Sequence, residues 1–124
     1  MIKFLNLAIG GMTGTVARYA VSGAVYRLFG TQFPYGTFAV NIAGCFILGF
    51  LAGISEKKWF LDPNARVLLM VGFCGAFTTF STVIFETANM LKDGETLRAA
   101  LNILVSVVAG LIILRTGIFI GEIL

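Results

Sequence analysis

The third apolar stretch of this 124-residue chain is interrupted halfway, at residues 72–82, by a segment rich in glycine and hydroxyl residues. The flanks, residues 67–72 and 83–91, are apolar enough to lie in a lipid bilayer, and the midpoint of the stretch falls at Thr79. The hydrocarbon core contains no water to bond backbone N–H and C=O groups that lack a helical partner. Irregular backbone at that depth must therefore be buried in protein or line a polar cavity. The sequence therefore predicts a helix broken near the bilayer centre, which is typical of an ion or substrate site.

The composition indicates an integral membrane protein. Hydrophobic residues make up 58% of the chain and charged residues only 12%, whereas a soluble domain carries about 25% charged residues. The net charge of +3 is not gathered on a basic face, so we expect no nucleic-acid partner. The chain has no histidine, the usual general base and a common metal ligand. The sequence shows no nucleophile–base pair, so an enzymatic function is disfavoured.

Four apolar segments are long enough to cross a bilayer, for which about 20 helical residues suffice. The first is too long for a cleaved signal peptide and is interpreted as a spanning helix. Short linkers join the segments, so residues 1–124 are expected to form one four-helix transmembrane domain in which the third helix is broken. The four predicted spans cover residues 4–29, 37–54, 67–91 and 97–124.

The loop charges predict that the chain can insert in either orientation. Four helices place both termini on one side of the membrane, with Lys3, Lys57, Lys58 and Arg66. The other side then carries Arg27, Lys92 and Arg98. Positive charge in loops sets orientation, and four against three is nearly no bias. An antiparallel dual-topology dimer becomes possible, in which the two breaks meet at the midplane.

Glycines spaced four apart predict close helix packing. Such pairs lie on one helix face and let membrane helices approach closely. Three pairs together favour a compact bundle or a dimer. The pairs are Gly10 and Gly14, Gly49 and Gly53, and Gly117 and Gly121.

Intramembrane polar residues are the candidate functional groups. Arg18 lies in the middle of the first span, where an arginine costs at least ~2.5–3.5 kcal/mol and needs a partner or a water-filled path. It is either an anion-attracting group or an anchor bonded to carbonyls or to Glu86. Asn41 either serves an anion or bonds between helices, and Glu86 pairs with Arg18 or with nearby hydroxyls. Ser106 extends a polar stripe on the fourth span.

The break itself offers groups of both signs. The carbonyls that end the first half-helix suit a hard cation such as Na⁺, and the N–H groups that open the second half suit an anion. The edge of an aromatic ring is electropositive, so Phe80 either stabilises a small anion or is ordinary packing. The hydroxyls of Ser81 and Thr82 follow directly.

These residues together resemble the Fluc (CrcB) family of fluoride channels, and the resemblance extends over all four spans. It includes the glycine run that leads from Gly10 to Arg18, and Tyr35-Gly36-Thr37 followed by Asn41-Ile42-Ala43-Gly44. Its most specific part is Gly72-Phe73-Cys74-Gly75-Ala76-Phe77-Thr78-Thr79-Phe80-Ser81-Thr82, with Glu86 beyond.

The resemblance implies an antiparallel dual-topology dimer in the cytoplasmic membrane with two fluoride pores. It implies a central, structural Na⁺ that is not transported, held by backbone carbonyls that fall here on Gly75 and Thr78. It implies that Asn41 lies on the pore, that Arg18 helps to form its vestibule, and that Phe80 presents its ring to fluoride. The family exports fluoride passively and so limits its toxicity. We add Ser81, Thr82 and Ser106 to the expected pore residues.

Some positions depart from the family pattern and leave alternatives open. Many members carry a second phenylalanine where this chain has Val83, and Ala109-Gly110 stands where relatives often have Gly-Ser. The chain is therefore either a homodimer subunit or one subunit of a heterodimeric channel with a paralogue. A small four-helix proton-coupled multidrug exporter is the main rival, but it needs an acid in its first helix, where this chain has Arg18. A non-conducting assembly subunit would not need the polar break.

Overall fold

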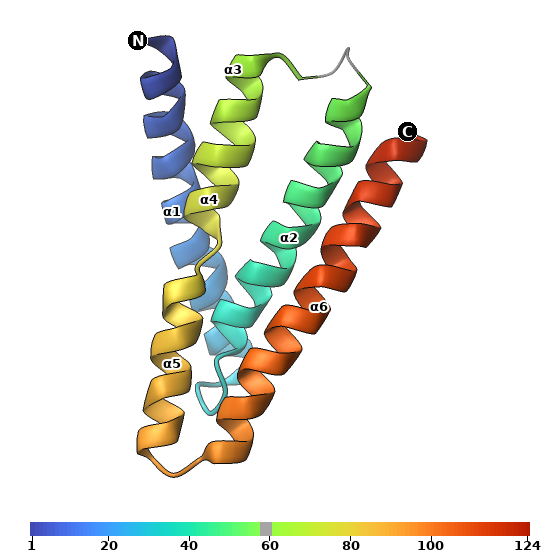
Figure 1. The fold of residues 1–124 in the computed structure, drawn as a ribbon. Helices are drawn as coiled ribbons and strands as arrows, with labels where there is room; N and C mark the ends of the chain where they lie inside the picture. Colours follow the sequence, from blue (N-terminus) through green and yellow to red (C-terminus); the bar gives the residue numbers. More distant parts are fainter. Residues whose placement is uncertain (58–60) are drawn as a thin grey trace.

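The structure is a computed structural model that describes residues 1–57 and 61–124, and every regular element in those residues is a helix. The helices form four rods (Figure 1). The first, second and fourth rods along the chain are single helices, and the third rod is a series of shorter helices. The single helices are α1 (Ile2–Phe29), α2 (Tyr35–Glu56) and α6 (Thr96–Ile123). The third rod comprises α3 (Pro63–Arg66), the π-helix η1 (Val67–Cys74), α4 (Gly75–Phe77) and α5 (Phe80–Lys92).

Local sequence signals explain where the rods begin and end. The third rod begins after Asp62, whose carboxylate accepts a 2.6 Å hydrogen bond from Ala65 N, with Pro63 in the first helical position. Helix α1 ends at Gly30, and the turn between α5 and α6 contains Gly94. Both glycines have positive φ, 84° and 80°, a conformation that costs little without a Cβ.

Both chain termini lie at the same end of the bundle, as the four-span interpretation predicts (Figure 1). Lys3, Lys57 and Arg66 belong to this end by their positions at the tips of α1, α2 and α3, whereas Lys58 lies outside the described residues. Arg27, Lys92 and Arg98 belong to the opposite end. The charges therefore divide between the two ends of the molecule as expected.

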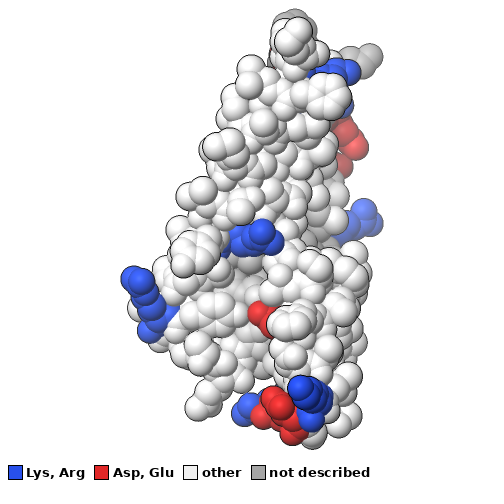
Figure 2. All heavy atoms as spheres, turned by 90° about the vertical axis from the view of Figure 1, so that its left-hand side faces the viewer, with Lys and Arg blue, Asp and Glu red and all other residues white. Residues whose placement is uncertain are grey.

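Within the described residues, three helical segments are long and apolar enough to cross a membrane: Tyr35–Glu56, Pro63–Lys92 and Thr96–Ile123. Helix α1 has the required length with 28 residues, but it is not among them, and it contains Arg18 and several polar residues. Large apolar side chains such as Leu111 and Ile112 are exposed, and most of the face in Figure 2 belongs to uncharged residues. The molecule is a helical membrane protein.

The paired glycines pack the rods against each other, which confirms a compact bundle. A Cβ at Gly117 would lie 2.9 Å from Phe50 N, and one at Gly53 would lie 3.0 Å from the Cα of Gly121. On the other side of the bundle, a Cβ at Gly10 would lie 2.8 Å from Phe73 N. The glycine faces of α2 and α6 therefore meet each other, and the glycine face of α1 meets η1.

Candidate functional site

The third rod is interrupted by two extended residues between α4 and α5. Thr78 has φ −89° and ψ 159°, and Thr79 has φ −151° and ψ 112°. Phe77 before the break is 4% exposed and Val83 after it is 6% exposed. The prediction of a broken helix is confirmed, and the unwound backbone lies beside buried residues.

The break is narrower than the expected range of residues 72–82. Gly72 remains in η1, where a Cβ would lie 3.0 Å from the Cα of Gly10. This glycine therefore serves close packing on α1 rather than unwinding. Gly75 and Ala76 also remain helical, in α4.

Asn41 holds the break against α2 through both polar atoms of its side chain. Its Oδ1 accepts a 2.7 Å hydrogen bond from Thr79 N, and its Nδ2 donates to Thr79 O at 3.0 Å. Gly44, one turn further along α2, leaves room for the side chain of Thr78, which a Cβ there would strike. Of the two roles considered for Asn41, the structure shows the bond between helices.

Two carbonyls at the break lack the N–H groups that would bond them in a continuous α-helix. In an α-helix the N–H of residue i+4 donates to the carbonyl of residue i. Thr79 N–H, the α-helical donor for Gly75 O, donates to Asn41. Thr82 N–H, the α-helical donor for Thr78 O, donates to Thr79 Oγ1 at 3.2 Å. Gly75 and Thr78 are the two residues expected to present carbonyls to a cation.

Thr79 also caps the start of α5. Besides accepting from Thr82 N, its Oγ1 donates to Thr82 Oγ1 at 2.8 Å and lies 3.4 Å from Ser81 Oγ. Such a cap satisfies one of the orphan N–H groups of a helix N-terminus. The hydroxyls of the expected residues Ser81 and Thr82 are thus gathered around Thr79.

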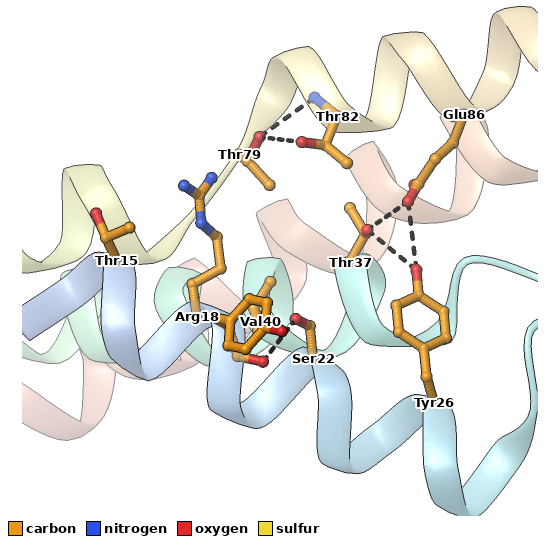
Figure 3. Close-up of a pocket in the computed structure, with 10 residues that line it drawn as sticks. Thr15, Arg18, Ser22, Tyr26, Thr37, Val40, Thr79, Thr82 and Glu86 are labelled. Atoms are coloured by element: carbon orange, nitrogen blue, oxygen red, sulfur yellow. Dashed lines mark hydrogen bonds between the residues drawn. The ribbon is translucent and has the colours of Figure 1, made fainter.

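A polar groove of about 370 Å³ lies between α1, α2 and α5 on one side of the break. Arg18 and Thr82, both expected site residues, line it together with Glu86. Figure 3 shows the guanidinium of Arg18 directed toward Thr79. Thr15, Ser22 and Tyr26 continue the α1 side of the groove at helical spacing around Arg18.

Glu86 is bonded to hydroxyls rather than to Arg18. Its Oε1 accepts from Thr37 Oγ1 at 2.6 Å and from Tyr26 OH at 3.3 Å (Figure 3). Its Oε2 is buried and has no hydrogen-bond partner in the described part of the chain. Of the two partners considered for Glu86, the hydroxyls are therefore the observed ones.

A second cavity of about 470 Å³ lies on the other side of the break and is mainly apolar. It is lined by Asn41, Thr78, Phe80 and Ser106 among others, and Thr79 lines both this cavity and the polar groove. The Phe80 side chain is 75% exposed. The structure thus groups Arg18 with Thr82, and Asn41 with Phe80 and Ser106, whereas Gly75 and Ser81 line neither space.

Several groove residues were missing from the expected site, among them Thr79, Thr37 and Tyr26. Thr79 contributes both through its backbone, which bonds to Asn41, and through its Oγ1, which caps α5; the backbone contact is one that no residue pattern identifies. Thr37 lies one turn before Asn41, and Tyr26 lies eight residues after Arg18, two turns along the same face of α1. This spacing was the signal available for both.

The fold and the site define a class: a small helical membrane protein with one helix unwound midway beside a polar groove. Residues 5–118 match the model of the family described as CrcB-like protein, Camphor Resistance (CrcB). The chain therefore belongs to the CrcB-like protein family, and the resemblance inferred from the break motif is confirmed.

Relatives of nearly the same length carry the name fluoride-specific ion channel FluC. One from Maridesulfovibrio salexigens is 43% identical over 124 residues, which cover 100% of this chain and 98% of the relative. One from Geotalea uraniireducens is 45% identical over 122 residues, 98% of each chain. One from Chlorobaculum tepidum is 44% identical over 122 residues, 98% of this chain and 96% of the relative. Because these names are those of ion channels, the prediction that the chain is not an enzyme is confirmed.

Proposed function

We infer that this chain forms a fluoride-specific ion channel that lets fluoride leave the cell passively and so limits its toxicity. The observation that carries the proposal is the two-residue break at Thr78 and Thr79, held by Asn41 between a polar groove and a second cavity. Relatives that match the chain over its whole length carry the name of such a channel.

The residues around the break suit a small, strongly hydrated anion. A pore must replace the water around such an ion with donors, without binding it too firmly for exit. Arg18 supplies one positive charge in the groove, and Thr82 and Ser81 supply hydroxyls. Nδ2 of Asn41 carries two hydrogens, of which one donates to Thr79 O, so the second remains for an anion. In the other cavity, Ser106 adds a hydroxyl and Phe80 a ring edge.

The carbonyls of Gly75 and Thr78 would hold a structural Na⁺. Their fit rests on the withdrawal of the N–H groups that normally bond them. Neutral carbonyl oxygens are hard ligands, which suit alkali and alkaline-earth cations, and the break contains no carboxylate that would favour a divalent ion. The ion would supply a fixed positive charge that ties together carbonyls from two chains, and it would not be transported.

The conducting unit in this proposal is an antiparallel dimer in the cytoplasmic membrane, in which α1 also crosses the bilayer. Two features of the single chain support it. Gly75 is exposed with no atom within 4 Å of a Cβ placed there, and Phe80 is largely uncovered. Both lie next to the break and are open to a second copy.

Fluoride efflux from liposomes that contain the purified chain alone tests the proposal. An ion-selective electrode should register fluoride release with no comparable chloride release. Val83 is buried where many relatives have phenylalanine, so a heterodimer is the second candidate. A silent chain that becomes active with a paralogous subunit would favour it. The proposal would be contradicted if neither the chain alone nor the chain with a paralogous subunit released fluoride. Proton-driven drug efflux without fluoride release would also contradict it.

A further inference from the structure

We propose that Tyr26 is the constriction residue between the polar groove and a second groove at the loop end of the bundle. This inference rests on the proposed channel function, because it assigns a role within that ion path. The second groove, of about 310 Å³, is formed by the turn before α2 and the end of α5. Tyr26 and Glu86 are the two residues that line both grooves.

The position of the Tyr26 ring is set by the neighbouring helix. Gly36 of α2 has no side chain to displace the ring, and a Cβ there would lie 2.6 Å from Tyr26 Cδ2. The hydroxyl at the other end of the ring lies 3.3 Å from Thr37 Oγ1 and donates to Glu86 Oε1 at 3.3 Å. Figure 3 shows the ring spanning from α1 toward Thr37 and Glu86. The ring is therefore held along its Cδ2–Cε2 side and at its hydroxyl, where the linings of the two grooves meet.

The loop-end groove is suited to water and ions rather than to packing. Polar residues such as Gln32 and Asn89 line it, as do the acids Asp93 and Glu95. Glu95 is paired with Arg98 at 3.1 Å, and Asp93 is exposed. Water screens exposed charges strongly, so Asp93 and Glu95 need not exclude an anion from this groove. Glu86, the third acid in the lining, accepts hydrogen bonds from Thr37 and Tyr26. An ion that moves from there to Arg18 passes Tyr26.

Removing the constriction should widen the path for larger anions. Pore diameter and lining donors set selectivity, so Tyr26→Ala is expected to raise chloride efflux from liposomes on the order of tenfold while fluoride efflux persists. Gly36→Ala should act in the same direction, because its methyl group displaces the ring without removing any tyrosine atom. That methyl group would also lie 2.7 Å from Ser22 O, so α1 and α2 must separate slightly in this variant. Tyr26→Phe should have a smaller effect than Tyr26→Ala, since the ring remains.

Tyr35→Ala is the matched control. Tyr35 lies at the same end of the bundle and packs on Phe33 with ring centroids 5.3 Å apart, but it lines neither groove. The ratio of fluoride efflux to chloride efflux in Tyr35→Ala should equal that of the unmodified chain. Unaltered chloride efflux in well-assembled Tyr26→Ala and Gly36→Ala would overturn the constriction. A Tyr26→Ala variant that loses fluoride efflux and gains no chloride efflux would also overturn the constriction. That result would mean that the fluoride path needs Tyr26 and is not narrowed by it.

A second measurement does not depend on conduction. In a Cys45→Ala, Cys74→Ala background, Thr82→Cys places a thiol in the polar groove. In the assembled dimer, where the proposed partner covers the groove, a small charged thiosulfonate reagent should label this thiol on the order of tenfold faster after Tyr26→Ala, because a wider path admits larger solutes. Equal labelling rates would refute the constriction even in a chain that does not conduct. Absence of fluoride efflux from the unmodified chain would instead count against the proposed function alone.

Discussion

Asn41 is the residue on which the shape of the break depends most directly. Its amide replaces the helical partners of Thr79 with one donor and one acceptor, at 3.0 and 2.7 Å. A buried backbone group without a partner costs about 1–3 kcal/mol. Without Asn41, the extended conformation at Thr79 would have to compete with a continuous helix or with unsatisfied backbone.

Asn41→Ala should therefore lower both stability and transport. We expect a loss of about 1–3 kcal/mol and a clear fall in fluoride efflux, measured by thermal unfolding in detergent and by the liposome assay. Asn6→Ala is the control, because Asn6 also donates from its side chain to a backbone carbonyl, that of Asn64, at the end of the bundle. Normal fluoride efflux from Asn41→Ala would show that the break does not need the hydrogen bonds between Asn41 and Thr79.

Phe80 should matter for conduction rather than for assembly. Its ring is largely exposed in the single chain and borders the cavity that contains Asn41 and Ser106. Phe80→Ile keeps an apolar side chain but removes the electropositive ring edge, so fluoride efflux should be abolished while the dimer remains intact. Phe85→Ile is the control, because Phe85 is exposed on the same helix but does not line that cavity. Unchanged efflux in Phe80→Ile would remove the ring from the mechanism.

At the scale of elements, facing glycines determine how closely α2 and α6 approach. Gly49 and Gly53 meet Gly117 and Gly121, so backbone packs on backbone over two turns. Any Cβ on these faces strikes main-chain atoms, which cannot move aside as a flexible side chain can. The helices must separate to accommodate it.

Gly117→Ala should consequently destabilise the fold by about 1–3 kcal/mol, the usual cost of overpacking. Gly23→Ala should have the opposite sign, because a Cβ there meets no atom within 4 Å. A helical glycine with free space for a Cβ gains roughly 0.5–1 kcal/mol when it is replaced by alanine. Thermal unfolding of both variants in one detergent measures the difference. Equal shifts for the two would show that the glycine face does not limit the approach of α6.

The helices were predictable from the sequence, whereas the contacts between them were only partly so. Apolar runs predicted the rods, because length and hydropathy are local properties. The extent of the break was not predictable, because the hydrogen bonds of Thr79 depend on Asn41, 38 residues away in the chain. Gly72 was assigned to the break because its packing partner, Gly10, lies on another helix. For the same reason, the sequence could not show that Glu86 bonds to Tyr26 and Thr37 rather than to Arg18.

For the whole molecule, the single chain leaves its most polar region open. The groove, the Gly75 backbone and the Phe80 ring are all accessible from outside the bundle. Loose polar groups in a bilayer have to be covered by protein or reached by water. A second, inverted copy would cover them and would bring two breaks together.

Gly75→Val should reduce the dimer fraction without unfolding the chain. The space around Gly75 is free within one chain, so a valine there would clash only with the partner in the proposed dimer. Gly23→Val, at another open position, is the control for the substitution itself. Chemical crosslinking in detergent, with and without Na⁺, measures the dimer. An undiminished dimer in Gly75→Val would place the partner elsewhere and argue against a shared cation at this carbonyl.

Electrical recording from a planar bilayer that contains the chain alone tests the central claim most directly. With fluoride at different concentrations on the two sides and chloride equal, the account predicts a current whose reversal potential follows the fluoride gradient. Changing the chloride gradient should leave that potential in place. A reversal potential that follows chloride would contradict a fluoride-selective path at the break of the third rod.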